Sequence, residues 1–394
     1  MTKICMYFQV HQPFRLRNFN YFTKDSNYFD EEKNRAIFEK VANKCYIPTT
    51  KKLIELIKKH PEFKVSFSFS GVFLEQAMKY RPEVIDLYKK LYDTGNMDIL
   101  NETYYHSLAY LISEDEFKEQ IKMHRELIRE IFGHKALVFR NTEAMLSNDM
   151  AEKVEKMGYK GIVGEGWDKI LGWRSPNYIY QPLNSDIKLI LRNYRLSDDI
   201  GFRFSKIDWI EYPLTADKYV SWLAASQGQT INLFLDYETF GEHQWKETGI
   251  FDFLEYLPKE VAKYPHLEWA KISELLELES KDRIDIPHIL SWADIDRDLS
   301  AWLGNKLQDN AFKKMKELGP HILNSGNKKL IDAWRKLQTS DHFYYMCTKW
   351  FADGDIHKYF NTYSNPYEAY SNYMNILNNF RLELGISSLK SQRI

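Results

Sequence analysis

Short runs of β-branched and aromatic residues recur through the first 236 residues, with helix-like segments between them. In segments 51–59 and 115–132, apolar residues recur at a spacing of three to four, which is typical of a helix with one buried face. Alternating strands and helices predict a parallel β-sheet, either closed or doubly wound. Seven runs are compatible with buried parallel strands: 3–10, 63–69, 97–101, 137–140, 160–164, 187–192 and 231–236.

Strand signals stop at about residue 270, and helix-like segments follow. They are 271–279, 295–317, 327–338 and 366–384, with turn signals at Gly319-Pro320 and Asn324-Ser325-Gly326-Asn327. The 394 residues suffice for two to three domains of about 150 residues, or for one α/β barrel of roughly 250 residues and a further unit. No linker rich in Pro, Gly or Ser divides the halves. We therefore expect residues 1–270 to form the α/β part and residues 271–394 to pack on it as a helical region.

Charge and composition exclude several classes of protein. The formal net charge is −1, and hydrophobic residues make up 44% of the chain, so neither nucleic-acid binding nor disorder is indicated. No apolar run is long enough for a membrane helix, and the N-terminus lacks a cleavable signal, so we expect a cytoplasmic protein with no membrane partner. The three cysteines are odd in number and widely spaced, which favours a reducing compartment.

Polar clusters follow five of the seven predicted strands. Parallel α/β proteins bind ligands at the carboxyl ends of their strands, so these clusters are candidates for one shared site. Any one of them alone is more often a solvated loop. The clusters are His11–Pro13, Asn101–His106, Arg140–Glu143, Glu165–Asp168 and Asp236–His243.

Carboxylates predominate in these clusters, and common motifs for other chemistry are missing. There is no dinucleotide-binding or Walker loop, no Gly-x-Ser-x-Gly elbow, and no pair of histidines four residues apart. We therefore expect neither a metal nor an organic cofactor. Aromatic residues make up 15% of the chain, and aromatic rings can stack on sugars. Two carboxylates acting on such a substrate describe glycoside hydrolysis.

Five segments, in this order, resemble the five sequence regions of glycoside hydrolase family 57, most of all its α-amylase-like branch. They are His11–Pro13, Gly95–Leu108, Phe139–Glu143, Leu235–His243 and Ser291–Asp294. The resemblance covers about residues 1–310, and Met346–Phe351 is also similar to that branch. It implies a (β/α)7 barrel over residues 1–270, followed by the helical region.

The resemblance also implies a retaining mechanism without a cofactor. Glu143 matches the nucleophile of the family and Asp236 its acid/base. His11, Glu238 and Asp294 match further active-site residues, and we add Glu102 as a sugar contact. The second region of the family usually carries Glu where this chain has Asp98. Asp98 is included as a sugar contact, although its shorter side chain departs from the family pattern. The implied substrate is an α-1,4-glucan or maltooligosaccharide, cleaved by hydrolysis. The alternative is a 4-α-glucanotransferase or another enzyme of the family that acts on α-glycosides.

Local chemistry supports these roles independently. Asp236 and Glu238 leave their strand on the same face, and two nearby like charges are costly, so one of them should keep its proton. A carboxylic acid with a raised pKa is what a general acid needs near neutral pH. Glu143 follows Arg140 and Asn141, a setting that favours the ionised form. The alternative for all of them is a structural network of salt bridges.

Other candidates carry a structural alternative of similar weight. Pro13 ends the first strand, so His11 lies at the carboxyl end of that strand, at the mouth of the expected barrel. A neutral imidazole there can form a hydrogen bond with a sugar hydroxyl. Trp167, Trp173 and Trp292 are possible stacking platforms or buried packing residues, and we expect only one of them to touch sugar. The charged tract from Arg192 to Arg203 lines either an outer subsite or the surface.

Two further classes remain as alternatives. A carbohydrate-binding protein without turnover would be expected to lack one of the two carboxylates, and both are present. A polysaccharide deacetylase would need clustered metal ligands, which the sequence does not offer. The sequence leaves open hydrolysis against transfer, linkage, chain length and oligomeric state.

Overall fold

The computed structural model describes residues 1–20, 25–349 and 362–386. All seven predicted strands are present, and all pair in parallel. One sheet has the order β3 (Met97–Ile99), β2 (Val65–Phe69), β1 (Thr2–Val10) and β8 (Thr230–Asp236), and β9 (Leu267–Trp269) also pairs with β1. A second sheet contains β4 (Val138–Arg140), β5 (Gly161–Glu165) and β7 (Lys188–Arg192), and β6 (Gln181–Pro182) pairs with β10 (Arg283–Ile284).

Hydrogen bonds link the edges of the two larger sheets on both sides. Between β3 and β4, the amide of Asn101 donates to the carbonyl of Val138 (3.1 Å), and the amide of Arg140 donates to the carbonyl of Asn101 (2.8 Å). Between β7 and β8, the amide of Asn193 donates to the carbonyl of Asn232 (2.9 Å). The carboxyl ends of strands from both sheets therefore lie close together.

The alternation of side chains along β1 shows how the strands separate two environments. Ile4, Met6 and Phe8 belong to a hydrophobic core that β1, β2 and β8 share with surrounding helices. Cys5 and Tyr7 point to the other face, where they pack with Val138 and other buried residues of the second sheet. The next residue on that face is the polar Gln9, whose side chain lies at the candidate site.

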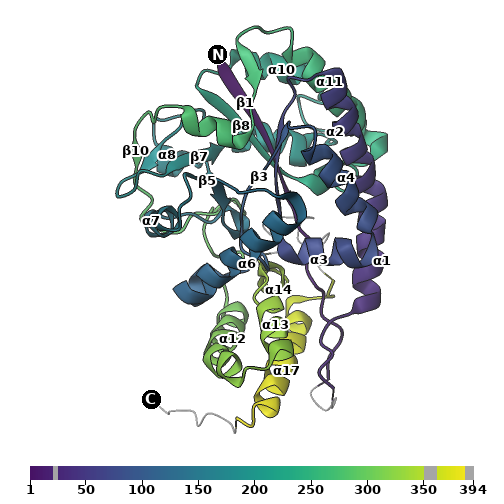
Figure 1. Cartoon of the computed structure of the whole chain (residues 1–394), viewed down its shortest axis with the longest axis vertical. Coiled ribbons are helices and arrows are strands. Elements are labelled where there is room, and N and C mark those ends of the chain that lie inside the picture. Colours follow the sequence, from purple (N-terminus) through teal and green to yellow (C-terminus); the bar gives the residue numbers. More distant parts are fainter. Residues whose placement is uncertain (21–24, 350–361, 387–394) are drawn as a thin grey trace.

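Helices connect successive strands, as Figure 1 shows. In α6 the local sequence sets both ends: Ser113 caps the amide of Glu116, and Gly133 ends the helix in the left-handed conformation. The connecting helices are α1 (Glu31–Val41), α2 (Ile47–Lys59), α3 (Gly71–Tyr80), α4 (Pro82–Tyr92), α5 (Ala109–Ile112), α6 (Glu114–Phe132), α7 (Asn148–Lys156), α8 (Asp168–Leu171), α9 (Tyr194–Asp198), α10 (Ala216–Ala225) and α11 (Ile250–Val261).

The C-terminal part is helical, and Figure 1 shows it at the end of the molecule opposite the N-terminus. Its core is shared with β4, β5 and β7, so Phe139 and Leu189 belong to the same buried cluster as Trp302 and Trp334. The helices are α12 (Lys306–Ser325), α13 (Lys328–Lys336), α14 (Ser340–Tyr344) and α17 (Pro366–Glu383), and a 3-10 segment η6 (Ile272–Glu277) precedes them.

Three predictions about this part are wrong in detail. The helix expected over 295–317 begins only at Lys306, because Asn305 caps it and residues 291–304 form turns. The turn expected at Gly319-Pro320 is absent, since α12 continues to Gly326, whose left-handed backbone ends it. A Cβ at Gly319 would lie 2.6 Å from the ring of Trp334, so Gly319 permits close helix packing and marks no turn. Strands also continue beyond residue 270, as β10.

Among the described residues, no helix combines the length and the apolar character needed to cross a bilayer.

Candidate active site

Glu143 lies just after β4 on a strained turn. Its φ is +57°, a left-handed conformation that residues other than glycine seldom adopt, and Ala144 follows with φ +51°. The indole N–H of Trp292 donates to Oε2 of Glu143 (2.9 Å), and the hydroxyl of Ser340 donates to Oε1 (2.9 Å). Strain at a hydrogen-bonded, largely buried carboxylate is typical of a functional position.

His106 connects Glu143 to a second buried carboxylate. Its Nδ1 lies 2.8 Å from Glu102 Oε2, and its Nε2 lies 3.6 Å from Glu143 Oε1. Burial alone would lower the pKa of His106, but the two carboxylates, Glu102 first, raise it to about 9. Burial would raise the pKa of Glu102, yet His106 and then Arg140 lower it to about 2. His106 is therefore a buried cation between two anions.

Arg140 supplies the second positive charge. Its side chain is fully buried, and its guanidinium lies over the ring of Trp292 at 4.6 Å. None of its three guanidinium nitrogens has a hydrogen-bond partner within the described chain. Burial would raise the pKa of Glu143, but His106 and then Arg140 lower it below its ordinary value. Glu143 is therefore ionised at neutral pH.

The pKa values of Asp236 and Glu238 are raised, in contrast to that of Glu143. Asp236 ends β8, and burial, followed by the charge of Glu143, raises its pKa to about 6. Burial also raises the pKa of Glu238 to about 8, and the charge of Asp236 adds to this effect, although the hydroxyl of Tyr46 donates to Oε1 of Glu238 (2.5 Å) and opposes it. The site thus combines an ionised Glu143 with carboxyl groups that keep their protons to higher pH.

His11 lies directly beside this cluster. Its ring stacks on the ring of His106, with centroids 4.1 Å apart and an angle of 20° between the planes. Its Nδ1 lies 2.7 Å from the hydroxyl of Ser70, and its Nε2 lies 3.0 Å from Oδ2 of Asp341. Burial and then the charge of His106 lower the pKa of His11. The neutral form of His11 is therefore favoured, and its contact with a sugar stays a prediction.

Trp292 and the other tryptophans differ in their surroundings. The guanidinium groups of both Arg140 and Arg192 lie over the ring of Trp292, at 4.6 and 5.7 Å, so its main contacts are with cations and with Glu143. Trp167 is half-buried at the end of β5 and packs on the second hydrophobic core. Trp173 is 85% exposed. Sugar stacking by any of the three stays a prediction.

The charged tract after β7 is largely an internal network. Arg192 donates to Glu165 (3.1 Å) and to Asp198 (2.6 Å), and Arg297 also lies 3.1 Å from Glu165. Arg297 donates to the carbonyl of Trp292 as well. These contacts fix the loop that carries Trp292, which favours the structural interpretation of Arg192.

For two predicted residues, Asp98 and Asp294, the described contacts are with other parts of the chain. The carboxylate of Asp98 accepts hydrogen bonds from the amides of Ile99 (2.9 Å) and Ser273 (3.0 Å), and it lies beside His134. These contacts tie β3 to η6 and do not support a sugar contact by Asp98. Asp294 lies two residues after Trp292 in a left-handed conformation (φ +56°), and its charge acts on Lys349.

Sequence reasoning missed Ser70, Tyr46, Ser340 and Asp341, all of which contact residues of the site. The first two come from a strand end and from the short π-helical segment η1 (Ala42–Tyr46), and the last two come from α14. The hydroxyl of Ser70 also caps α3, so its sequence signal is that of an ordinary helix start.

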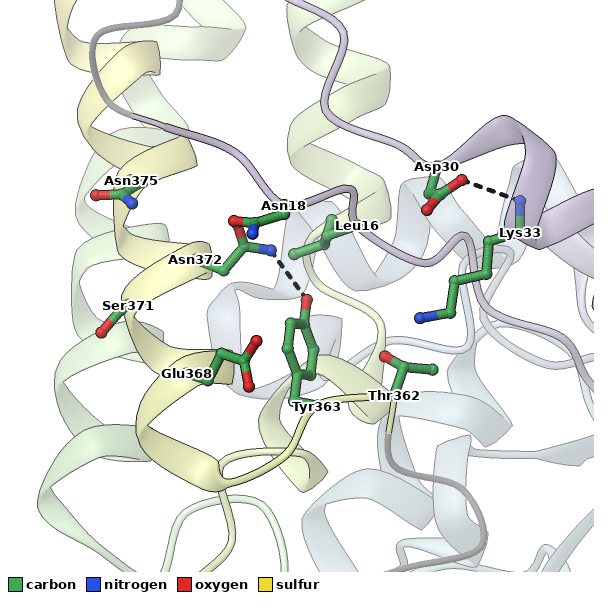
Figure 2. A pocket seen from close by; sticks show the side chains of 10 residues that line it. All are labelled: Leu16, Asn18, Asp30, Lys33, Thr362, Tyr363, Glu368, Ser371, Asn372 and Asn375. Carbon is green, nitrogen blue, oxygen red and sulfur yellow. Dashed lines mark hydrogen bonds between the residues drawn. The ribbon is translucent and has the colours of Figure 1, made fainter.

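A cavity of about 310 Å³ lies elsewhere, between α17 and the chain around α1. Figure 2 shows polar side chains such as Asn18, Lys33 and Glu368 around it. None of the described residues that line this cavity belongs to the candidate site, so the cavity and the candidate site are separate. Within the described ranges, no three His, Cys, Asp or Glu side chains are grouped so that they could hold a metal ion.

Comparison with known proteins identifies the family. The sequence model of "Glycosyl hydrolase family 57" matches residues 5–287. The chain belongs to glycosyl hydrolase family 57. The resemblance that the five sequence segments indicated is thereby confirmed, and the protein is a glycosidase of this family.

Relatives within family 57 agree in sequence and in fold. A protein of Methanocaldococcus jannaschii named "Putative alpha-amylase" is 50% identical over 95% of this chain and 83% of its own length. Among solved structures, a family 57 branching enzyme from Thermococcus kodakaraensis has a TM-score of 0.70 at 13% identity, over 97% of this chain and 90% of that one. The 4-alpha-glucanotransferase of Thermococcus litoralis has a TM-score of 0.68 at 17% identity, over 95% of this chain but only 59% of that one. Both structural matches describe the fold alone.

Proposed function

We propose that the protein cleaves α-1,4-glucans with retention of configuration, with Glu143 as the nucleophile and Asp236 as the acid/base. The observation that carries this proposal is the difference in pKa between the two carboxyl groups. The pKa of Glu143 is lowered, while burial raises that of Asp236 to about 6. A nucleophile has to be ionised and a general acid has to be protonated at the same pH.

The reaction follows from these charge states. Asp236 donates its proton to the glycosidic oxygen while an oxygen of Glu143 attacks the anomeric carbon, so the glycosidic bond breaks and a glycosyl ester forms. The ionised Asp236 then accepts a proton from water, whose oxygen attacks the anomeric carbon and releases Glu143. The first step leaves Glu143 as an ester and Asp236 as a carboxylate, and the second step returns Glu143 to a carboxylate and Asp236 to a carboxylic acid.

We infer that the strands form a closed (β/α)7 barrel. Hydrogen bonds at both sheet edges, through Asn101 and Asn193, support closure. One buried cluster also contains residues from β1, β4, β5, β7 and β8, as expected for the interior of a ring. On this basis we infer that residues 1–270 are the catalytic barrel and that the described residues after 270 are a largely helical region packed on it.

The relatives support the choice of α-glucan as substrate. The Methanocaldococcus jannaschii relative is named an alpha-amylase, and the Thermococcus litoralis neighbour is a 4-alpha-glucanotransferase. Transfer is therefore the second candidate function. Both reactions use the same covalent intermediate, which is resolved by water in one case and by a sugar hydroxyl in the other.

A time course with one defined maltooligosaccharide tests both candidates. Products shorter than the substrate alone indicate hydrolysis, and products longer than the substrate indicate transfer. Glu143→Gln serves as the matched control, because it keeps the shape of the side chain and removes its charge. If the wild-type protein leaves maltooligosaccharides and longer α-glucans unchanged, the proposed substrate class is wrong.

A further inference from the structure

The short helix α14 lies outside residues 5–287, which the family model matches, yet its first two side chains reach the candidate site. The hydroxyl of Ser340 donates to Oε1 of Glu143 (2.9 Å). The carboxylate Oδ2 of the next residue, Asp341, lies 3.0 Å from Nε2 of His11. A helix from the C-terminal region thus contacts both the proposed nucleophile and a proposed sugar-binding residue.

Backbone and side-chain hydrogen bonds fix α14 against the loop that carries His106. The amide of Ser340 donates to the carbonyl of His106 (3.0 Å), and the hydroxyl of Thr339 donates to the carbonyl of Tyr105 (2.9 Å). One residue earlier, the carbonyl of Gln338 accepts from the amide of Leu108 (3.0 Å). Ser340 is fully buried, so its hydroxyl has a defined place relative to Glu143.

Two hydrogen bonds reach Glu143, and both come from residues much later in the chain. Trp292 donates to Oε2 and Ser340 donates to Oε1, so each carboxylate oxygen has one donor. Two such donors restrict rotation of the carboxylate plane and stabilise the anion. A stabilised anion is also a better leaving group when the glycosyl ester is hydrolysed.

We propose that Ser340 is a positioning residue, which orients the carboxylate of Glu143 for attack and helps its release, so that α14 is a working part of the active site. This inference rests on the proposed role of Glu143 as nucleophile. It assigns a function to a residue that lies beyond the matched family region.

Steady-state kinetics of Ser340→Ala test the proposal. Losing a hydrogen bond to a charged group should lower kcat roughly tenfold to a hundredfold, with little change in KM. The acid limb of the pH profile should move to higher pH, because Glu143 then loses a donor that favours its ionised form. Ser340→Cys, which is similar in size and a weaker donor, should lie between Ala and wild type. Ser371→Ala is the matched control, since Ser371 is exposed on α17 in the same helical region.

A measurement that needs no turnover separates this inference from the proposed function. In the full chain labelled with ¹³C at glutamate carboxyl carbons, the resonance lost in Glu143→Gln identifies Glu143. Its titration midpoint should move to higher pH in Ser340→Ala. If the wild-type protein is inactive and the Glu143 midpoint still differs between wild type and Ser340→Ala, the proposed function is wrong while the contact between Ser340 and Glu143 is supported. An active wild-type protein whose rate, pH profile and midpoint are the same in Ser340→Ala would overturn the role of Ser340.

Discussion

The imidazole rings of His11 and His106 stack at 4.1 Å, and each ring is held by a different carboxylate. Glu102 lies 2.8 Å from His106, and Asp341 lies 3.0 Å from His11. The two rings nevertheless differ in charge, because His106 also faces Glu143 and has a pKa of about 9, while burial lowers the pKa of His11. The cluster therefore places a neutral imidazole next to an imidazolium that lies beside Glu143.

Replacement of Glu143 should abolish turnover and leave the fold intact. We expect Glu143→Ala to lose roughly 10³-fold or more in kcat, because the variant lacks the carboxylate that is proposed to form the ester. Added azide should partly restore cleavage by acting as the nucleophile. Assays with and without azide, together with thermal unfolding, check this. Activity within a few-fold of wild type in a folded variant would remove Glu143 from the mechanism.

The first-formed product should keep the α configuration of the cleaved bond. Double displacement inverts the anomeric centre twice, whereas direct attack by water inverts it once. Proton NMR during the first minutes of the reaction, before mutarotation, distinguishes the two outcomes. An initial β product would exclude the covalent role of Glu143 while leaving open a glycosidase that inverts.

His106→Asn should impair activity most at acidic pH. The backbone of His106 is left-handed (φ +48°), which Asn tolerates, so the fold should persist. Loss of the imidazolium removes the main influence that lowers the pKa of Glu143, so the acid limb of the kcat/KM profile should move to higher pH. We expect a loss of roughly tenfold or more below the shifted limb. The exposed His321→Asn is the control, and an unchanged profile in His106→Asn would contradict this account.

The buried acid Glu238 should make stability depend on pH. Its pKa is about 8 in the folded protein, above its ordinary value of 4.5, so folding favours the protonated form. Stability from this group is complete at low pH and falls as pH rises, by up to about 1.4 kcal/mol for each pH unit between the two values. Glu238→Gln removes this dependence. Urea denaturation at pH 5 and pH 7.5 should thus show that the free energy of unfolding of the variant, relative to that of wild type, is greater at the higher pH.

Substitution of an exposed glutamate provides the comparison. Glu247→Gln makes the same chemical change at the surface, and its stability relative to wild type should be nearly equal at both pH values. If Glu238→Gln behaved in the same way, Glu238 would not be held in its protonated form.

Chelation should leave activity and thermal stability unchanged, since the proposed mechanism assigns the carboxylates to proton transfer and covalent chemistry. Assays after dialysis against EDTA check this prediction. Loss of activity that zinc restores would favour metal-dependent chemistry of the deacetylase kind.

The sequence predicted those parts of the fold and site that depend on local pattern. Buried runs located all seven strands, and the polar residues after them include Glu143, Asp236 and His11, which the structure brings into one cluster while their roles stay predictions. Ser340 and Asp341 could not be found in this way, because a serine and an aspartate at a helix start are ordinary capping residues. Their role depends on Gln338 and Thr339 pairing with the loop that carries His106, which is a contact between distant parts of the chain.

The wrong turn at Gly319-Pro320 has the same origin. Locally the pair is typical of a turn, but the packing of Trp334 against Gly319 keeps the helix continuous. The contacts of Asp98 with Ser273 and His134 also come from other elements, which local pattern could not predict, and its sugar contact stays a prediction. Local pattern locates a side chain near a site, and long-range packing decides whether that side chain faces it.

The left-handed backbone at Glu143 implies a conflict between durability and function. Glycine adopts φ near +57° without strain, whereas glutamate does not, so a chain selected for durability alone would favour glycine there. Glu143→Gly should be inactive and relieve this strain, but it also removes the acceptor of Trp292 and Ser340 and the carboxylate beside His106, so its melting temperature measures which effect is larger. If Glu143 is the nucleophile, as proposed, its chemistry explains why this backbone conformation carries a residue other than glycine.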